Sequence, residues 1–101
     1  MPENTSFSIV YTKRSNTDAI AIKNYLLYKF TQKEVARFYR LLQIFESVVI
    51  VFPELYPLSS KGKGVHRAVL SKQLSVFYKI GQNEIAVVAI LDNRVDYSKW
   101  P

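Results

Sequence analysis

The feature that most constrains this fold is a run of seven apolar residues near the C-terminal end, Ile85-Ala86-Val87-Val88-Ala89-Ile90-Leu91. A bilayer span needs about 20 apolar residues, so this run is far too short for one. Its length fits a buried β-strand, which we place at Glu84–Leu91. A strand that is apolar on both faces is expected to be central in its sheet and covered on both sides.

Two further strands precede this run, at Val65–Ser71 and Leu74–Ile80. The connections Ser71–Gln73 and Gly81–Asn83 are short enough only for hairpins. The C-terminal half is therefore predicted to be an antiparallel three-stranded meander. It follows the glycine- and serine-rich segment 59–64, which has the composition of a loop.

The N-terminal half carries one strand pattern and two helical patterns. Phe7, Ile9 and Tyr11 alternate with polar residues, which predicts a half-buried strand. Candidate N-caps at Ser15–Asp18 precede a first apolar stripe at helical spacing, and the capping-box spacing Thr31–Glu34 precedes a second one. The first stripe is Ala19, Ile22, Leu26 and Phe30, and the second is Val35, Phe38, Leu42, Phe45 and Val49.

The short break at Lys29–Gln32 predicts that these helices form an antiparallel hairpin, and Pro53 ends the second one. The predicted order is β-α-α-β-β-β, an α+β fold with the helical hairpin packed on one sheet. A length of 101 residues fits a single domain over residues 1–101.

The cysteine and histidine content of the chain limits the kinds of site it can form. The chain has no cysteine, which excludes disulfides, thiolate catalysis and cysteine-ligated zinc, and a lone His66 makes a histidine metal cluster unfavourable. We therefore expect neither a metal site nor a cofactor. The start MPENTSFS lacks the basic and apolar regions of a secretory signal, so the expected location is the cytoplasm, without a membrane partner.

Positive charge is concentrated in one block. Residues 57–83 hold five basic residues and no acidic one, namely Lys61, Lys63, Arg67, Lys72 and Lys79. Such a block attracts polyanions or an acidic protein partner. A solvated sheet face plus a loop is the plainer interpretation. The Lys61–Gly64 stretch is not a phosphate loop, because a strand follows it where a helix is required.

Arg67 occupies an unusual position, because strand alternation places it on one face with Val65 and Val69. Three explanations remain open: it snorkels at a sheet edge, pairs with a carboxylate, or projects into a concave binding surface. Arg94, just past the last strand, is expected near Arg67 if the meander folds as predicted, and Asp92 and Asp96 are equally good partners for it. Tyr78 is expected in the core.

Several motifs, taken in order, resemble the toxins of the RelE/ParE superfamily. They are Phe52-Pro53-Glu54-Leu55, the strand Val65–Leu70 with its arginine, the strand Leu74–Ile80, Glu84-Ile85 and the turn Asp92-Asn93-Arg94-Val95-Asp96. The resemblance covers nearly the whole chain, and it lies in the order and spacing of these motifs rather than in any single one. It implies the toxin of a type II toxin–antitoxin module, neutralised by a cognate antitoxin that is expected to be encoded by an adjacent gene and to carry a disordered acidic tail.

The superfamily divides into RelE-like members, which cut mRNA on the ribosome, and ParE-like members, which poison DNA gyrase. Arg67 and Arg94 match basic positions of the cutting branch. The chain departs from that branch at Ser75, where an arginine is common, and at Asp92, where a histidine is common. Both departures remove positive charge that stabilises a phosphoryl transition state, so the ParE-like branch is favoured.

Each possible function has its own candidate residues. For a ribonuclease the candidate catalytic residues are Arg67, Arg94, His66 and Tyr97, the last two as proton-transfer groups. For binding the gyrase or ribosomal target, or nucleic acid, the candidates are Lys61, Lys63, Arg67, Lys72 and Arg94. A plain nucleic-acid-binding module is the second alternative. It needs exposed aromatics among the basic residues, and only Phe77 and Tyr78 are available in the block.

Overall fold

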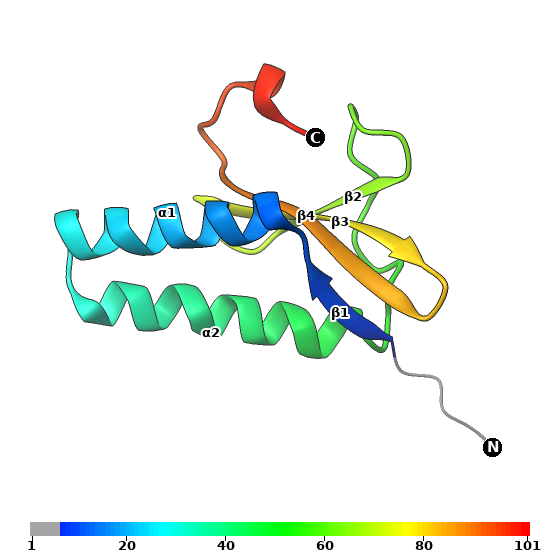
Figure 1. Ribbon diagram of the computed structural model, residues 1–101, viewed down its shortest axis with the longest axis horizontal. Coiled ribbons are helices and arrows are strands. Elements are labelled where there is room, and N and C mark those ends of the chain that lie inside the picture. Colours follow the sequence, from blue (N-terminus) through cyan, green and yellow to red (C-terminus); the bar gives the residue numbers. More distant parts are fainter. Residues whose placement is uncertain (1–6) are drawn as a thin grey trace.

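The computed structural model describes residues 7–101, and they follow the predicted α+β order (Figure 1). The elements are β1 Ser8–Tyr11, α1 Lys13–Lys29, α2 Gln32–Val49, β2 Val65–Val69, β3 Leu74–Gly81, β4 Glu84–Asp92 and a 3-10 turn η1 Tyr97–Lys99. The segment 1–6, which carries most of the stretch used to argue against a secretory signal, lies outside the described residues. Within the described part, no helix has the length and apolar character that crossing a membrane requires.

The strands form one sheet in the order β1-β4-β3-β2. β2, β3 and β4 are the predicted antiparallel meander. β1 pairs in parallel with β4, with Ile9 opposite Ile85, so the sheet as a whole is mixed. The helical hairpin carries the chain from β1 at one edge to β2 at the other, and β4 has a neighbour on both sides. The prediction of a central last strand is confirmed.

The start of α1 corrects the sequence prediction. The helix begins at Lys13, and its N-cap is Thr12, whose hydroxyl accepts the Ser15 amide hydrogen at 3.2 Å. The chain leaves the sheet directly after β1, with the Thr12 amide donating to the Val87 carbonyl at 3.0 Å, so the predicted caps at Ser15–Asp18 lie inside the helix. Thr31 does cap α2, but its side chain makes no capping hydrogen bond, so the capping box is not formed.

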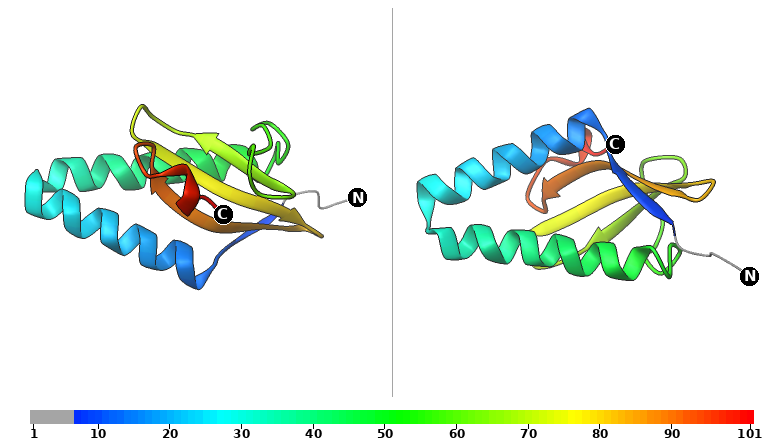
Figure 2. Two further views of the ribbon diagram at one scale, coloured as in Figure 1. Left: turned by 90° about the horizontal axis from the view of Figure 1, so that it is seen from above. Right: turned by 60° about the horizontal axis from the view of Figure 1, so that its bottom comes forward.

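The helices pack on one face of the sheet, which we call the helix face (Figure 2). The predicted stripe of α2 supplies Phe38, Leu42, Phe45 and Val49, all buried. They pack against the buried strand residues Ala68, Leu74, Val76, Tyr78, Ile85, Val87 and Ile90. The prediction of Tyr78 as a core residue is confirmed.

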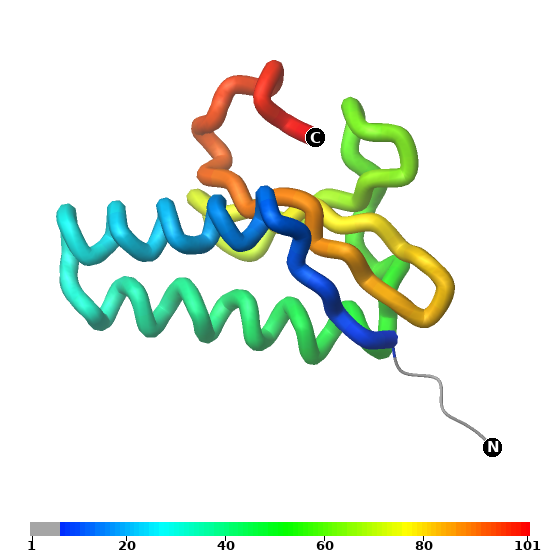
Figure 3. Tube along the Cα trace, in the orientation of Figure 1, coloured from blue at the N-terminus to red at the C-terminus, as the bar shows by residue number. Residues whose placement is uncertain are grey.

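The opposite side of the sheet, which we call the outer face, has a smaller apolar cluster. Val65, Phe77 and Ala89 are buried there, with Trp100 packed against them. Figure 3 shows the C-terminal segment turning back over this side of the sheet after β4. β4 is therefore covered on both faces, as its composition predicts.

A β-bulge decides which residues of β4 face each way. Tyr78 pairs with Val87, but the preceding Phe77 pairs with Ala89, so Val88 is the extra residue. Without the bulge, alternation would turn Val87 and Ala89 to the same face. With it, Val87 enters the helix-face core and Ala89 the outer cluster.

Candidate functional site

The outer face gathers several of the basic residues of the block 57–83. In the β2–β3 register Val65 lies opposite Lys79 and Arg67 opposite Phe77, and paired side chains share a face. Lys61 reaches the same side from the loop before β2. We call Lys61, Arg67, Ser75, Asn93, Tyr97 and Trp100 the Arg67 cluster.

Arg67 is held by neutral groups. Its Nε donates to Ser75 Oγ at 3.1 Å and its Nη2 to Asn93 Oδ1 at 3.1 Å. The guanidinium carbon lies 4.5 Å from the centroid of the Trp100 ring, in cation–π geometry. No carboxylate among residues 7–101 forms an ion pair with it. Pairing with a carboxylate, one of the three explanations for this arginine, is therefore not found there, and no acidic side chain in that part of the chain pairs with its charge.

Ser75 and Asn93 fix the orientation of this guanidinium. The buried Ser75 hydroxyl donates a short hydrogen bond to Asn93 Oδ1. The Asn93 side chain in turn donates to the carbonyls of Ser71 at 3.1 Å and Lys72 at 3.0 Å. Asn93 is thus tied to the β2–β3 turn, and its oxygen is presented to Arg67 in one position.

Sequence reasoning treated Ser75 only as a lost arginine and did not single out Asn93. The signal was available for Ser75, because the register Val69 opposite Ser75 places it diagonally beside Arg67. Nothing in the local sequence shows that Asn93 turns toward β2.

Lys61 and Tyr97 join the cluster from the flanking segments. Lys61 Nζ donates to the carbonyls of Tyr97 at 3.1 Å and Ser98 at 2.8 Å, and lies 5.4 Å from the Tyr97 ring centroid. The Tyr97 and Trp100 rings are 4.9 Å apart. Three residues predicted for the site, Lys61, Arg67 and Tyr97, are therefore connected through Trp100, to which the sequence analysis gave no role.

His66 faces the other way. Its ring stacks on Tyr78 at 5.0 Å with an interplanar angle of 16°, and its Nδ1 lies 2.7 Å from the Tyr56 carbonyl. The Tyr78 hydroxyl donates to the Pro53 carbonyl at 2.6 Å, and burial raises the pKa of Tyr78 to about 12. Strand alternation puts His66 and Arg67 on opposite faces of β2, so the structure does not bring these two candidates together.

Arg94 is also separated from the Arg67 cluster. Its exposed side chain makes two parallel bonds to Asp92, Nε to Oδ1 at 3.0 Å and Nη2 to Oδ2 at 2.8 Å. This pairing lowers the pKa of Asp92 and raises that of Arg94. The structure shows no hydrogen bond between Arg94 and Arg67, and the preceding residue, Asn93, is the one that bonds Arg67. Lys63, which precedes β2 in the chain, and Lys72, which follows it, are both exposed.

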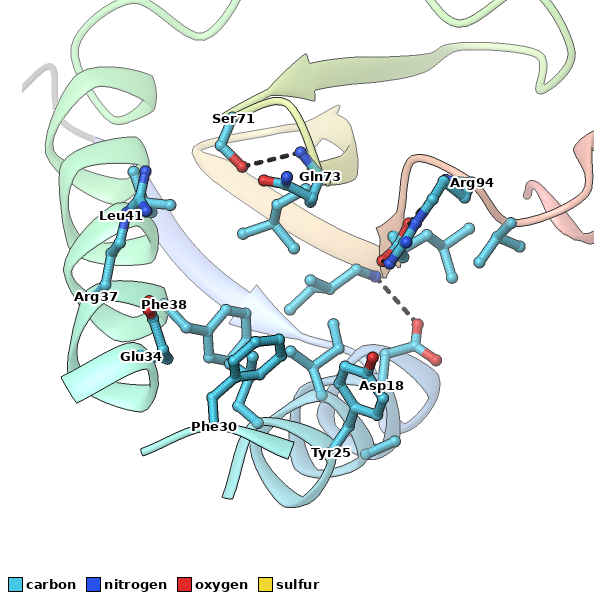
Figure 4. Close-up of a pocket in the computed structure, with 18 residues that line it drawn as sticks. Asp18, Tyr25, Phe30, Glu34, Arg37, Phe38, Leu41, Ser71, Gln73 and Arg94 are labelled. Carbon is cyan, nitrogen blue, oxygen red and sulfur yellow. Dashed lines mark hydrogen bonds and ion pairs between the residues drawn. The ribbon is translucent and has the colours of Figure 1, made fainter. Parts of the chain in front are cut away.

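A groove opens between the helical hairpin and the end of the sheet (Figure 4). It has a volume of about 790 Å³, and its walls include Tyr25 and Phe30 near the hairpin tip, Arg37 and Leu41 of α2, and Arg94. Tyr25 is 48% exposed and Phe30 is 55% exposed. Asp18, on the same wall, accepts the Ile90 amide hydrogen at 3.0 Å, which satisfies a β4 donor beyond the end of β1.

No side-chain cluster in residues 7–101 has the composition of a metal site. The outer face offers an oriented guanidinium, without a carboxylate partner among residues 7–101, beside aromatic rings and a lysine. Such a surface binds anionic groups and flat rings.

Comparison with known proteins gives a match of fold. No family model matches the chain, and no curated protein matches it by sequence. A chain of the chromosomal ParDE TA system from P. aeruginosa superposes with a TM-score of 0.73 at 15% identity, covering 88% of this chain and 98% of that one.

Two further solved structures agree. The conserved hypothetical protein HP0894 from Helicobacter pylori gives a TM-score of 0.57 at 15% identity, covering 86% of this chain and 94% of its own. YafQ from E. coli gives 0.51 at 18% identity, covering 86% and 93%. At these identities the matches show the fold over nearly the whole chain.

Proposed function

We propose that this chain, which has the fold of the RelE/ParE toxins, is the toxin of a type II toxin–antitoxin module acting in the cytoplasm. The observation that carries the proposal is the nearly complete superposition on a chain of a ParDE TA system. The Arg67 cluster supports it, because an arginine that has no carboxylate partner among residues 7–101 is suited to contacting an anionic group on a target.

For the target we propose DNA gyrase, as in the ParE-like branch. Cleavage of mRNA needs cations that stabilise a phosphoryl transition state and groups that move protons. Beside Arg67 the third strand offers Ser75, a neutral side chain, and Arg94 is bound to Asp92. His66 is on the opposite face, where it contacts Tyr56 and Tyr78. Of the candidate proton-transfer groups, only Tyr97 lies in the cluster.

The second candidate is ribosome-dependent mRNA cleavage, which the uncompensated charge of Arg67 beside Tyr97 and Lys61 favours. A plain nucleic-acid-binding module has less support. The two aromatics that the sequence offered for stacking on bases, Phe77 and Tyr78, are both buried. Stacking requires an exposed ring.

The proposed partner is a cognate antitoxin with a disordered acidic tail that folds on contact. The groove between hairpin and sheet has the size and the apolar walls to take an amphipathic segment of it. The acid-free block 57–83 attracts the acidic tail.

The two toxic mechanisms give opposite results in one pair of assays. We expect the purified chain to lower gyrase supercoiling or to accumulate cleaved gyrase–DNA complexes, while mRNA in a translation reaction stays intact. The Arg67→Ala variant is the matched control for both assays. Discrete mRNA cuts at A-site codons, absent with that variant, would transfer the chain to the RelE-like branch.

The toxin assignment itself is tested through its partner. Expression of the chain alone is expected to arrest growth, and co-expression with the adjacent gene is expected to restore growth and yield a stable complex on purification. A good yield of the chain alone, without growth arrest, would contradict the toxin proposal for the ParE-like and the RelE-like branch alike.

A further inference from the structure

The segment after β4 covers Arg67 and the outer face beside it, without burying any residue of its own from 94 to 101. Residues 94–101 are all exposed or half-buried, whereas Val65, Phe77 and Ala89 beneath them are buried. Figures 1 and 2 show this segment as a separate strap over the outer face. A segment with few buried contacts opens locally at a lower free energy than the strands it covers.

The strap has few attachments. Lys61 Nζ holds the carbonyls of Tyr97 and Ser98, and Arg14 Nη2 donates to the Lys99 carbonyl at 2.7 Å. A fourth bond runs from Ser60 Oγ to the Tyr97 hydroxyl at 3.3 Å. All four bonds are exposed and contribute little individually. The main anchor is Trp100, whose ring lies 5.3 Å from that of Phe77.

Trp100 packs against Arg67, which has no carboxylate partner among residues 7–101. The Arg67 guanidinium carbon lies over the Trp100 ring, while Nε and Nη2 are engaged by Ser75 and Asn93. Gly62 allows the strap to lie close, because a Cβ there would come within 2.6 Å of the Pro101 carbonyl. In this closed form Arg67 presents only part of its surface to a target.

We propose that residues 96–101 are a displaceable cover of Arg67, held shut by Trp100 and opened when an anionic group of the target takes the place of the indole. The proposal rests on the proposed role of Arg67 in target binding and adds the regulation of that site. Opening breaks two cation–π contacts, four exposed hydrogen bonds and the Trp100–Phe77 ring contact, and leaves the helix-face core untouched.

The test measures how accessible Arg67 is to chemical modification. The folded protein is treated with p-hydroxyphenylglyoxal, and the modification rate of each arginine is followed by peptide mass spectrometry. Arg40, exposed on α2, is the internal reference. Arg67 is expected to react more slowly than Arg40 in the wild type, and about tenfold faster in Trp100→Ala, as for loss of one partly desolvated cation–π contact.

A second variant tests the proposal in case Trp100→Ala does not fold. Arg14→Ala releases the Lys99 carbonyl and removes an exposed 3.8 Å ion pair with Asp18 within α1. It is expected to raise the Arg67 rate and the acrylamide quenching of Trp100, the one tryptophan in the chain. Tyr28→Ala, at a position 83% exposed and far from the strap, is the matched control and should change neither.

Two results would overturn the cover. One is an Arg67 rate in the wild type equal to that of Arg40. The other is an unchanged Arg67 rate in folded Trp100→Ala or Arg14→Ala. None of these measurements depends on toxicity, so the cover is tested separately from the proposed function.

Discussion

Replacement of Arg67 by alanine is expected to abolish growth arrest while leaving the protein folded. The side chain has no buried carboxylate to leave unpaired, and Asn93 Oδ1 keeps the hydrogen bond from Ser75. The free energy of unfolding should therefore fall by about 2–3 kcal/mol, from one lost cation–π contact and two lost hydrogen bonds, which leaves the protein folded. Urea unfolding and a growth assay on the same variant measure the two effects.

Two controls separate charge from geometry. Arg67→Lys keeps the charge but cannot donate to Ser75 and Asn93 in the fork of a guanidinium, so it should recover little toxicity. Arg94→Ala removes an equally charged but exposed arginine, whose partner is Asp92. We expect it to retain most toxicity. A fully folded and fully toxic Arg67→Ala would refute the site and leave the fold unaffected.

The second large effect is a loss of stability at alkaline pH that depends on Tyr78. Burial raises the pKa of this phenol to about 12 in the folded protein, against about 10 in an unfolded chain. Between these values the unfolded state binds fewer protons than the folded state, so stability falls as pH rises. One such group lowers the free energy of unfolding by up to about 1.4 kcal/mol per pH unit in this window, and has no effect below it.

Tyr78→Phe separates this effect from others. The variant loses the hydrogen bond to the Pro53 carbonyl, which costs about 1 kcal/mol at neutral pH, and it should show a shallower alkaline fall. Tyr11, whose pKa is raised by burial and by its hydrogen bond to Glu46, adds a contribution of the same sign. Tyr28→Phe is the exposed control. An equally steep fall in wild type and Tyr78→Phe, measured by urea unfolding across the window, would contradict the assignment.

The candidate site shows where sequence reasoning stops. The odd placement of Arg67 was visible from strand alternation alone, and Lys61 and Tyr97 were named with it. Their connection through Trp100 was not visible, because it depends on the C-terminal segment returning over the sheet. The sequence pointed to Arg94 as the residue after β4 that lies near Arg67, whereas the side chain there that bonds Arg67 is Asn93.

By itself, the sequence determined the elements and their order, because periodicity, proline and short hairpin connections act over a few neighbouring residues. The apolar run 85–91 alone required a central strand covered on both faces. The tertiary structure decided which elements surround this strand. β1 pairs with it in parallel, the helices cover one of its faces and Trp100 covers the other. It also decided the bulge at Val88, which sends Val87 and Ala89 to opposite faces. These choices depend on contacts between residues far apart in the chain, for which local patterns carry no signal.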